Sequence, residues 1–261
     1  MGAPGRPGAT DMPRALPERH DDEPAFVLHA YPYKETSLIV EAFARGHGRV
    51  GMVARGAKRP RSELRGLLQA FQPIALSWAG TAELKTLVKA EWRGGVPLPA
   101  GASLLAAFYL NELLLKLLPR EDPHPALWDG YEDALGALAA GTGAGAQAVV
   151  LRGFEVRLLA ELGYALPLTR EADTGNAIDP HARYHYAFDA GPRRHAGEPG
   201  ARWPVVRGAT LIALAEQRFP DPSIAAEARQ LMREVLDHHL ESRRIESRRI
   251  VADLRSLDGE P

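Results

Sequence analysis

Apolar and polar residues alternate with a period of two over most of residues 26–92, which is the pattern of β-strands with one buried face. The pattern predicts about five short antiparallel strands: Phe26–Tyr33, Ser37–Ala44, Arg49–Arg55, Ala70–Trp78 and Glu83–Trp92. A small sheet hides its edges most simply by closing on itself, so we expect a β-barrel. The number of strands does not distinguish an OB-like barrel from an SH3-like barrel.

The alternation also assigns faces within the predicted strands. Ile74, Leu76 and Trp78 share one face of the fourth strand. In the fifth strand the inward positions are expected to be Leu84, Thr86, Val88, Ala90 and Trp92. Lys85 and Lys89 would then point outward into solvent.

The period changes to 3.6 beyond Pro97 and Pro99, which predicts a helical second half. The expected helices are Ser103–Leu118, Pro123–Ala139, Ala146–Leu162, Arg207–Phe219 and Ser223 to about Arg249. One side of the first helix is expected to carry Leu104, Phe108, Leu115 and Leu118. Gly163 would cap the third helix, and residues 165–205 lose the helical period, as in a loop or a small hairpin.

We therefore expect an α+β protein with a β-barrel followed by a helical domain. Residues 1–25 are rich in Pro, Gly and charge and are predicted to form a disordered tail. The barrel would occupy residues 26–95, and the helical domain residues 96–261 with an irregular insertion at about 165–205. The sequence Glu-Ser-Arg-Arg-Ile occurs twice in succession from Glu241, which we interpret as a local duplication in a solvated helical end.

Charge is distributed unevenly, although the formal net charge is only -1. Residues 1–25 carry a net -2, residues 26–95 a net +6 and residues 96–261 a net -5. Such asymmetry indicates that the barrel region meets a polyanion, the alternative being chance scatter of surface charge. The chain has no cysteine, no apolar run of about 18 residues and no N-terminal signal segment, so we expect a cytoplasmic protein.

The positive charge concentrates in residues 55–66, between the third and fourth predicted strands, where Glu63 is the only acid. Gly56, Pro60 and Gly66 disfavour a regular helix or strand there. We expect this loop and the strands beside it to hold nucleic-acid phosphates. The candidate contacts are Lys34, Arg49, Arg55, Lys58, Arg59, Arg61, Arg65, Lys85 and Lys89.

Two aromatic residues lie beside these candidates. Tyr31 and Tyr33 share a face of the first predicted strand. They would either stack on bases or pack against a neighbouring strand.

The chain contains none of the catalytic motifs GxSxG, HExxH and GxxxxGK[ST]. Gly46, Gly48 and Gly51 match GxGxxG, but a strand rather than a helix follows them, so we interpret the motif as a hairpin turn. Three histidines after the third helix lack the spacing of a known metal site: His181, His185 and His195. We therefore expect no enzymatic activity, no metal and no other cofactor.

Six segments carry a further signal: Phe26–Leu38, Gly48–Ala57, Leu84–Leu87, Tyr109–Leu114, Leu151–Glu155 and Leu162–Tyr164. Among them are Gly-Arg-Val-Gly-Met-Val-Ala-Arg-Gly-Ala from Gly48 and Leu-Arg-Gly-Phe-Glu from Leu151. In their sequence, their order and their layout of a barrel before helices, they resemble the bacterial RecO family of DNA-repair recombination mediators. The segments cover most of residues 26–165, and Leu240–Ile245 resembles the family's C-terminal segment more loosely.

The resemblance implies an N-terminal OB-fold β-barrel followed by a mainly α-helical C-terminal domain. It implies binding to single- and double-stranded DNA, annealing of complementary strands and partnership with RecR. It also implies docking to the acidic C-terminal tail of single-strand-binding protein so that RecA can be loaded. It implies that the protein works in the cytoplasm with the nucleoid and does not associate with membranes. Some members bind zinc through four cysteines after the third helix, so a chain without cysteine should have a zinc-free insertion there.

Two arginines are our candidates for the contact with that acidic tail, Arg152 and Arg157. The alternative for Arg152 is an ion pair within its own helix, with Glu155. A non-catalytic RNA-binding OB-fold protein would use the same basic barrel and remains the alternative function. A nuclease would require clustered acids for Mg²⁺, whereas residues 26–95 hold only five dispersed ones.

Overall fold

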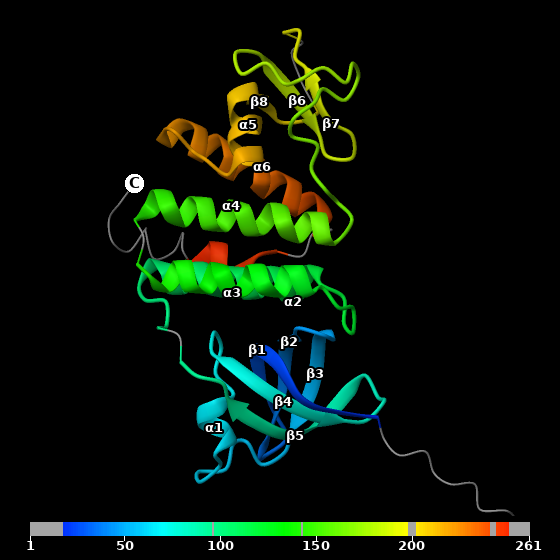
Figure 1. Ribbon diagram of the computed structural model, residues 1–261, viewed down its shortest axis with the longest axis vertical. Helices are drawn as coiled ribbons and strands as arrows, with labels where there is room; N and C mark the ends of the chain where they lie inside the picture. The colour runs from blue at the N-terminus through cyan, green and yellow to red at the C-terminus, as the bar shows by residue number, and fades with distance from the viewer. Residues whose placement is uncertain (1–17, 96, 142, 198–201, 241–243, 251–261) are drawn as a thin grey trace, which may run out of the picture.

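Figure 1 shows the computed structural model of the protein, which describes residues 18–95, 97–141, 143–197, 202–240 and 244–250. A β-barrel lies at one end, the helices are stacked beside it, and a small β-sheet lies at the opposite end. Residues 1–17 of the predicted disordered tail lie outside the described residues.

The barrel is closed by β1 Arg19–Tyr33, β2 Ser37–Ala44, β3 Gly48–Ala54, β4 Pro73–Ala79 and β5 Leu84–Trp92. Their order around the barrel is β1-β2-β3-β5-β4, with β3 and β5 paired in parallel and the other pairs antiparallel. A short helix, α1 Leu64–Leu67, lies between β3 and β4. This is the arrangement of an OB-like barrel, which settles the alternative that the strand number left open.

Alternate residues of the strands fill the interior of the barrel, as the period of two predicts. Val40 and Ala42 of β2 are completely buried there. The predicted face of the fourth strand is confirmed, because Ile74, Leu76 and Trp78 all lie in the same interior cluster.

The predicted faces of β5 are partly wrong, although Ala90 is buried and Lys89 is exposed, as expected. Lys85 is buried, whereas Val88 is 49% and Trp92 is 61% exposed. The pairing of β4 with β5 shifts register between Ser77 and Trp78. An irregularity of this kind changes the phase of the alternation within a strand, so a strict period of two fails there.

β1 begins at Arg19, before the expected Phe26, so residues 19–25 form a strand of the barrel and not part of a tail. This first part of β1 pairs with β4 in an irregular register. Asp22 adopts a positive φ of 53°, and its backbone N–H donates a hydrogen bond to Ser77 Oγ at 3.0 Å. Polar side chains dominate the segment, so apolar periodicity does not reveal it.

The helices of the second half are α2 Ala102–Leu117, α3 Pro125–Ala139, α4 Ala144–Glu161, α5 Gly208–Glu216 and α6 Pro222–His239. In Figure 1, α2 and α3 lie next to the barrel, and α4 separates them from α5 and α6. The last predicted helix is shorter than expected, and residues 246–250 form a separate helical turn. None of the helices in the described ranges is long and apolar enough to cross a membrane.

The predicted apolar side of α2 is partly wrong. Phe108 is 43% exposed, and Leu104 and Leu115 are half-buried, whereas Leu110 is completely buried. Phe108 of α2 packs edge-on against Phe71 of the barrel domain, with ring centroids 4.9 Å apart. The buried face of α2 is therefore rotated relative to the predicted one, because α2 packs against the barrel as well as against helices.

The segment predicted to be irregular contributes to a three-stranded sheet of order β7-β6-β8, which extends to residue 207. Its strands are β6 Arg183–Ala187, β7 Gly191–Arg194 and β8 Val205–Arg207. The hairpin of β6 and β7 is one of the two structures expected for this segment, and β8 was not expected.

A hydrogen-bonded carboxylate ties this sheet to the segment before it. Glu171 accepts hydrogen bonds from Thr174 Oγ1 at 2.6 Å, Tyr184 OH at 3.1 Å and Arg194 Nε at 3.2 Å. The bond from Thr174 is the main cause that lowers the pKa of Glu171, and those from Tyr184 and Arg194 add to it while burial opposes it.

The residues of this segment do not fit a zinc ion. The chain has no cysteine. Ring nitrogens of His185 and His195 lie 2.6 Å apart, but no group of three or more potential ligands converges anywhere in the described part of the chain.

The barrel and the helices share one continuous core, which includes Phe26 and Phe43 of the barrel with Trp128 and Tyr131 of α3. Trp128 Nε1 donates a hydrogen bond to the carbonyl oxygen of Phe43 at 3.1 Å. Asn111 Nδ2 of α2 donates to the carbonyl of a β1 residue, Leu28, at 2.8 Å. The two domains are thus joined by buried contacts, and Arg45 adds a two-pronged surface ion pair with Asp129 at 2.8 and 3.0 Å.

The second copy of Glu-Ser-Arg-Arg-Ile docks on α2. Glu112 accepts hydrogen bonds from the backbone N–H groups of Glu246 at 2.7 Å and Ser247 at 2.8 Å, and it therefore caps the final helical turn. Arg248 Nη1 reaches Asp237 of α6 at 2.7 Å, and its Nη2 donates to Tyr109 OH at 3.2 Å. The first copy begins at residues 241–243, outside the described residues.

We predict that Glu112→Ala releases residues 244–250 from the helical domain. The substitution removes the cap of the helical turn and should cost about 1–3 kcal/mol of local stability. Burial raises the pKa of Glu112, but hydrogen bonds from Ser247, Lys116 and the Glu246 backbone outweigh it and lower that pKa. The docking should therefore persist above the ordinary glutamate pKa and be lost as the pH falls through the lowered value.

Hydrogen exchange of the Ser247 amide measures this release. The exposed Glu216 supplies the control, since Glu216→Ala should leave protection at Ser247 unchanged. Equal protection of Ser247 in the wild type and in Glu112→Ala would contradict the capping role.

Candidate nucleic-acid interface

The basic loop between β3 and β4 is built from successive turns and is anchored to the barrel. The backbone N–H of Lys58 donates to the carbonyl oxygen of Thr36 at 2.9 Å, which ties the loop to the β1–β2 turn. Ala57 beside it is fully buried, and Gly56 takes a positive φ of 71° that lets the chain leave β3 sharply. The loop therefore presents its side chains from a fixed backbone.

The end of the loop differs from the expectation of irregular structure. Residues 64–67 form helix α1, although Gly66 lies within it. Leu64 and Leu67 pack against the interior cluster of the barrel, and Leu68 is buried there. This apolar anchoring favours a helical turn where glycine alone would disfavour it.

Six cationic residues lie on this loop and on the neighbouring β1–β2 turn. We call them the cationic loop surface: Lys34, Arg55, Lys58, Arg59, Arg61 and Arg65. All six are exposed, and none has a carboxylate within ion-pair distance among the described residues. Only two acids, Glu35 and Glu63, lie in the same two segments, so the surface keeps a strong net positive charge.

Some other cations of the barrel are already paired. Arg19 binds Asp21 at 2.9 Å, and Lys89 binds Glu91 at 2.8 Å and Asp22 at 3.6 Å. The hydrogen bond to Glu91 is the main cause that raises the pKa of Lys89. A paired cation has less to gain from a phosphate, so Lys89 is a weaker candidate than the residues of the cationic loop surface.

Two of the expected phosphate contacts have structural roles instead. Arg49 Nε donates to the carbonyl oxygen of Leu118 at 2.9 Å, and its Nη1 binds Glu41 at 3.1 Å. Lys85 is buried and its Nζ lies 2.7 Å from Glu121 Oε1. Both side chains join the barrel to the segment after α2, so we leave them out of the proposed DNA contacts.

The aromatic residues of β1 lie beside the cationic loop surface. Tyr31 is 44% exposed, and its ring packs at 4.3 Å from the ring of His29. Lys34 Nζ lies over the Tyr33 ring, 5.2 Å from its centroid. The two alternatives for these tyrosines were stacking on bases and packing against a neighbouring strand. Tyr31 has the accessible ring that stacking requires, whereas the Tyr33 ring contacts a cation.

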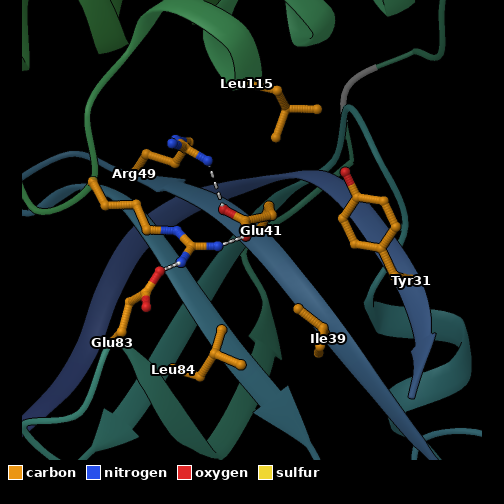
Figure 2. A pocket seen from close by; sticks show the side chains of 8 residues that line it. Tyr31, Ile39, Glu41, Arg49, Glu83, Leu84 and Leu115 are labelled. Carbon is orange, nitrogen blue, oxygen red and sulfur yellow. Dashed lines mark hydrogen bonds and ion pairs between the residues drawn. The ribbon is translucent and has the colours of Figure 1, made fainter.

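A pocket opens where Tyr31 meets the helical domain, with a cavity volume of about 440 Å³. Its walls come from β1, β2, β3, β5, the approach to β5, α2 and the segment after α2 (Figure 2): Tyr31, Ile39, Glu41, Arg49, Glu83, Leu84, Leu115 and Arg120. The sequence analysis missed this site, because its residues come from segments far apart in the chain and no local pattern joins them.

The predicted partner-binding arginines do not form one site. Arg152 is 8% exposed and pairs with Glu155 in its own helix, which is the alternative that the sequence offered. Arg157 is exposed on α4 and lies against Gly130 of α3. Glu155 also accepts a hydrogen bond from Tyr109 OH at 2.7 Å, so the Arg152 pair belongs to a buried network and is closed to an incoming peptide.

An OB-like barrel with an exposed cationic surface, fixed on a helical domain, is typical of the class of nucleic-acid-binding proteins. The chain belongs to the RecO family. The family description "Recombination protein O N terminal" matches residues 21–96, and "Recombination protein O C terminal" matches residues 99–249.

Relatives align along almost the whole chain. It is 47% identical over 240 residues to "DNA repair protein RecO" of Aromatoleum aromaticum, covering 92% of this chain and 98% of the relative. It is 48% identical over 242 residues to the protein of the same name from Dechloromonas aromatica, covering 93% and 99%. The Burkholderia pseudomallei protein of that name is 43% identical over 254 residues, covering 97% and 91%.

Proposed function

We propose that this chain is a DNA repair protein that acts as a recombination mediator without catalysing a reaction. It binds single- and double-stranded DNA, anneals complementary strands and helps load RecA onto DNA coated with single-strand-binding protein. The observation that carries the proposal is the cationic loop surface, where six exposed cations have no carboxylate partner among the described residues. The relatives named as DNA repair proteins support the same role.

The surface suits the DNA backbone more than base edges. Lysine and arginine bind phosphates with little regard to sequence and release counterions as they do so. A mediator must act on any damaged sequence, and contacts of this kind meet that requirement. Such a protein would work in the cytoplasm with the nucleoid.

RecR and the acidic C-terminal tail of single-strand-binding protein are the proposed partners. Arg157 is the candidate contact for the tail, since it is an exposed residue of α4. Arg152 is withdrawn from that role because it is buried against Glu155. The tail would then meet the helical domain while the barrel holds DNA.

A strand-annealing assay tests the proposal, with complementary labelled oligonucleotides, either bare or coated with single-strand-binding protein. We expect this chain to accelerate annealing in both cases, and to lose the effect on coated strands when the coating protein lacks its acidic tail. No acceleration with bare strands would contradict the proposal. Acceleration of RNA strands but not of DNA strands would favour the alternative of an RNA-binding OB-fold protein.

A further inference from the structure

We propose that the pocket between β1 and α2 receives one unstacked nucleobase of the single-stranded DNA whose backbone lies on the cationic loop surface. This inference rests on the proposed function and adds a base-binding site to it. The pocket would act without reading sequence, because every base presents an aromatic face for stacking.

The pocket lies near the cationic loop surface, because Tyr31 lines it and Lys34 belongs to that surface. Lys34 stands at the β1–β2 turn, and Lys58 Nζ lies 3.5 Å from the Lys34 carbonyl oxygen. Tyr31 lies on β1 three residues before Lys34, and three residues of extended chain span about 10 Å. A strand held by phosphate contacts at Lys34 and Lys58 therefore passes within reach of the Tyr31 ring.

Tyr31 provides a restrained and accessible stacking platform. Its side chain is 44% exposed, and the His29 ring lies against it with an interplanar angle of 56°. Figure 2 shows Tyr31 on one side of the pocket, opposite Arg49 and Glu83. Two rings in contact limit the motion of the tyrosine, so less conformational entropy is lost when a base stacks on it.

The remaining walls suit a flat ligand with a polar edge. Ile39, Leu84 and Leu115 contribute the apolar part of the lining. The other half of the lining is formed by the charged residues Glu41, Arg49, Glu83 and Arg120. Small-ligand sites likewise combine apolar walls with placed polar groups. A flipped base is read in the same way elsewhere, by stacking and by hydrogen bonds to its edge.

The charges of the pocket balance, which disfavours a phosphate. Glu41 is 3% exposed and is bound by both Arg49 and Arg120. Arg120 also binds Glu83. Two guanidinium groups thus face two carboxylates, so an incoming anion would have to compete with existing ion pairs. A neutral base does not have to replace an ion pair, and the charged side chains offer hydrogen-bond donors and acceptors to the edge of the base.

The test compares Tyr31→Ala with Tyr31→Phe, and uses Tyr164→Ala as the matched control. Tyr164 is 52% exposed and lies after α4, remote in sequence from the barrel. Affinities for single-stranded and duplex DNA would be measured by fluorescence anisotropy. We expect Tyr31→Ala to lose about 5- to 100-fold in affinity for single strands, from the loss of one stacked base, with Tyr31→Phe close to wild type.

Duplex affinity should stay unchanged in all three variants, because bases in a duplex are already stacked. If Tyr31→Ala binds single strands as well as Tyr164→Ala does, the pocket inference is overturned. If wild-type affinity itself survives charge reversal of the cationic loop surface, the proposed function fails instead, so the two failures are distinguishable.

A second measurement uses the unaltered protein. Single-stranded DNA containing 5-iodouracil would be irradiated in the complex and the crosslinked peptide identified. We expect a crosslink at Tyr31, and crosslinks confined to residues that do not line the pocket would overturn the assignment.

Discussion

Reversing three charges of the cationic loop surface, with Lys58→Glu, Arg59→Glu and Arg61→Glu together, should abolish DNA binding while the protein stays folded. The three side chains are exposed and none has a carboxylate partner in the described part of the chain, so their replacement breaks no internal ion pair. Each lost charge-assisted contact is worth about 1.5–3 kcal/mol, and three lost contacts predict a fall in affinity of about 1000-fold or more. Fluorescence anisotropy with a labelled single strand measures it.

The control is an equal charge change on the helical half. Arg183, Arg218 and Arg229 are exposed there, and reversing all three alters the net charge by the same amount. We expect this control to bind DNA within a few-fold of wild type at moderate salt, because screening weakens charges far from the DNA. A comparable loss of affinity in both triple variants would show that overall charge, and not the loop, governs binding.

Gly48→Ala should destabilise the junction of the barrel and the helical domain. A Cβ atom at Gly48 would lie 2.0 Å from the carbonyl oxygen of Asp122, so one of the two backbones must move. The residue also has a φ of 68°, a left-handed conformation that costs a side-chain-bearing residue about 1–2 kcal/mol. With about 1–3 kcal/mol more for overpacking, the expected loss lies within about 2–5 kcal/mol, and we take about 3 kcal/mol.

A loss of that size should lower the melting temperature by about 6–12 °C, measured by differential scanning calorimetry. Gly46→Ala is the matched control in the same turn. There the nearest atom to an added Cβ is Glu23 Oε1 at 2.9 Å, the end of a side chain that can move away. Equal melting temperatures for the two variants would contradict the tight junction described here.

The position of Gly48 also explains its motif. Gly46, Gly48 and Gly51 imitate a dinucleotide-binding sequence, and the prediction of a hairpin turn is confirmed because β2 and β3 pair on either side of it. The sequence could not indicate that Asp122 fills the space above Gly48. That contact depends on how the segment between α2 and α3 folds back on the barrel.

Much of the fold follows from periodicity, since buried faces repeat locally along each strand and helix. β2 was predicted with its observed ends, and the α+β arrangement is confirmed. The failures lie where long-range packing overrides the local pattern. The register shift beside Ser77 changes the phase of β5, so that Val88 lies outward and Lys85 inward.

The candidate site was predictable only in part. The exposed cations of residues 55–66 stand out in the sequence, because a dense run of charge on a loop has few ways to be buried. Arg49 looked equivalent to them, but its partner Leu118 lies 69 residues further along the chain. The pocket beside Tyr31 also depends on contacts between residues far apart in the chain, since Arg120 and Leu115 reach it only through the docking of the two domains.

The central claim is that the cationic loop surface binds the phosphates of DNA, and the salt dependence of binding tests it most directly. The affinity for single-stranded DNA would be measured against salt concentration for wild type and for a neutralised variant, Lys58→Gln with Arg59→Gln and Arg61→Gln. Each phosphate contact contributes about 0.7 to the slope of log affinity against log salt on single strands. The account predicts a steep wild-type slope that is shallower by about 2 in the variant, and identical slopes in the two proteins would contradict it.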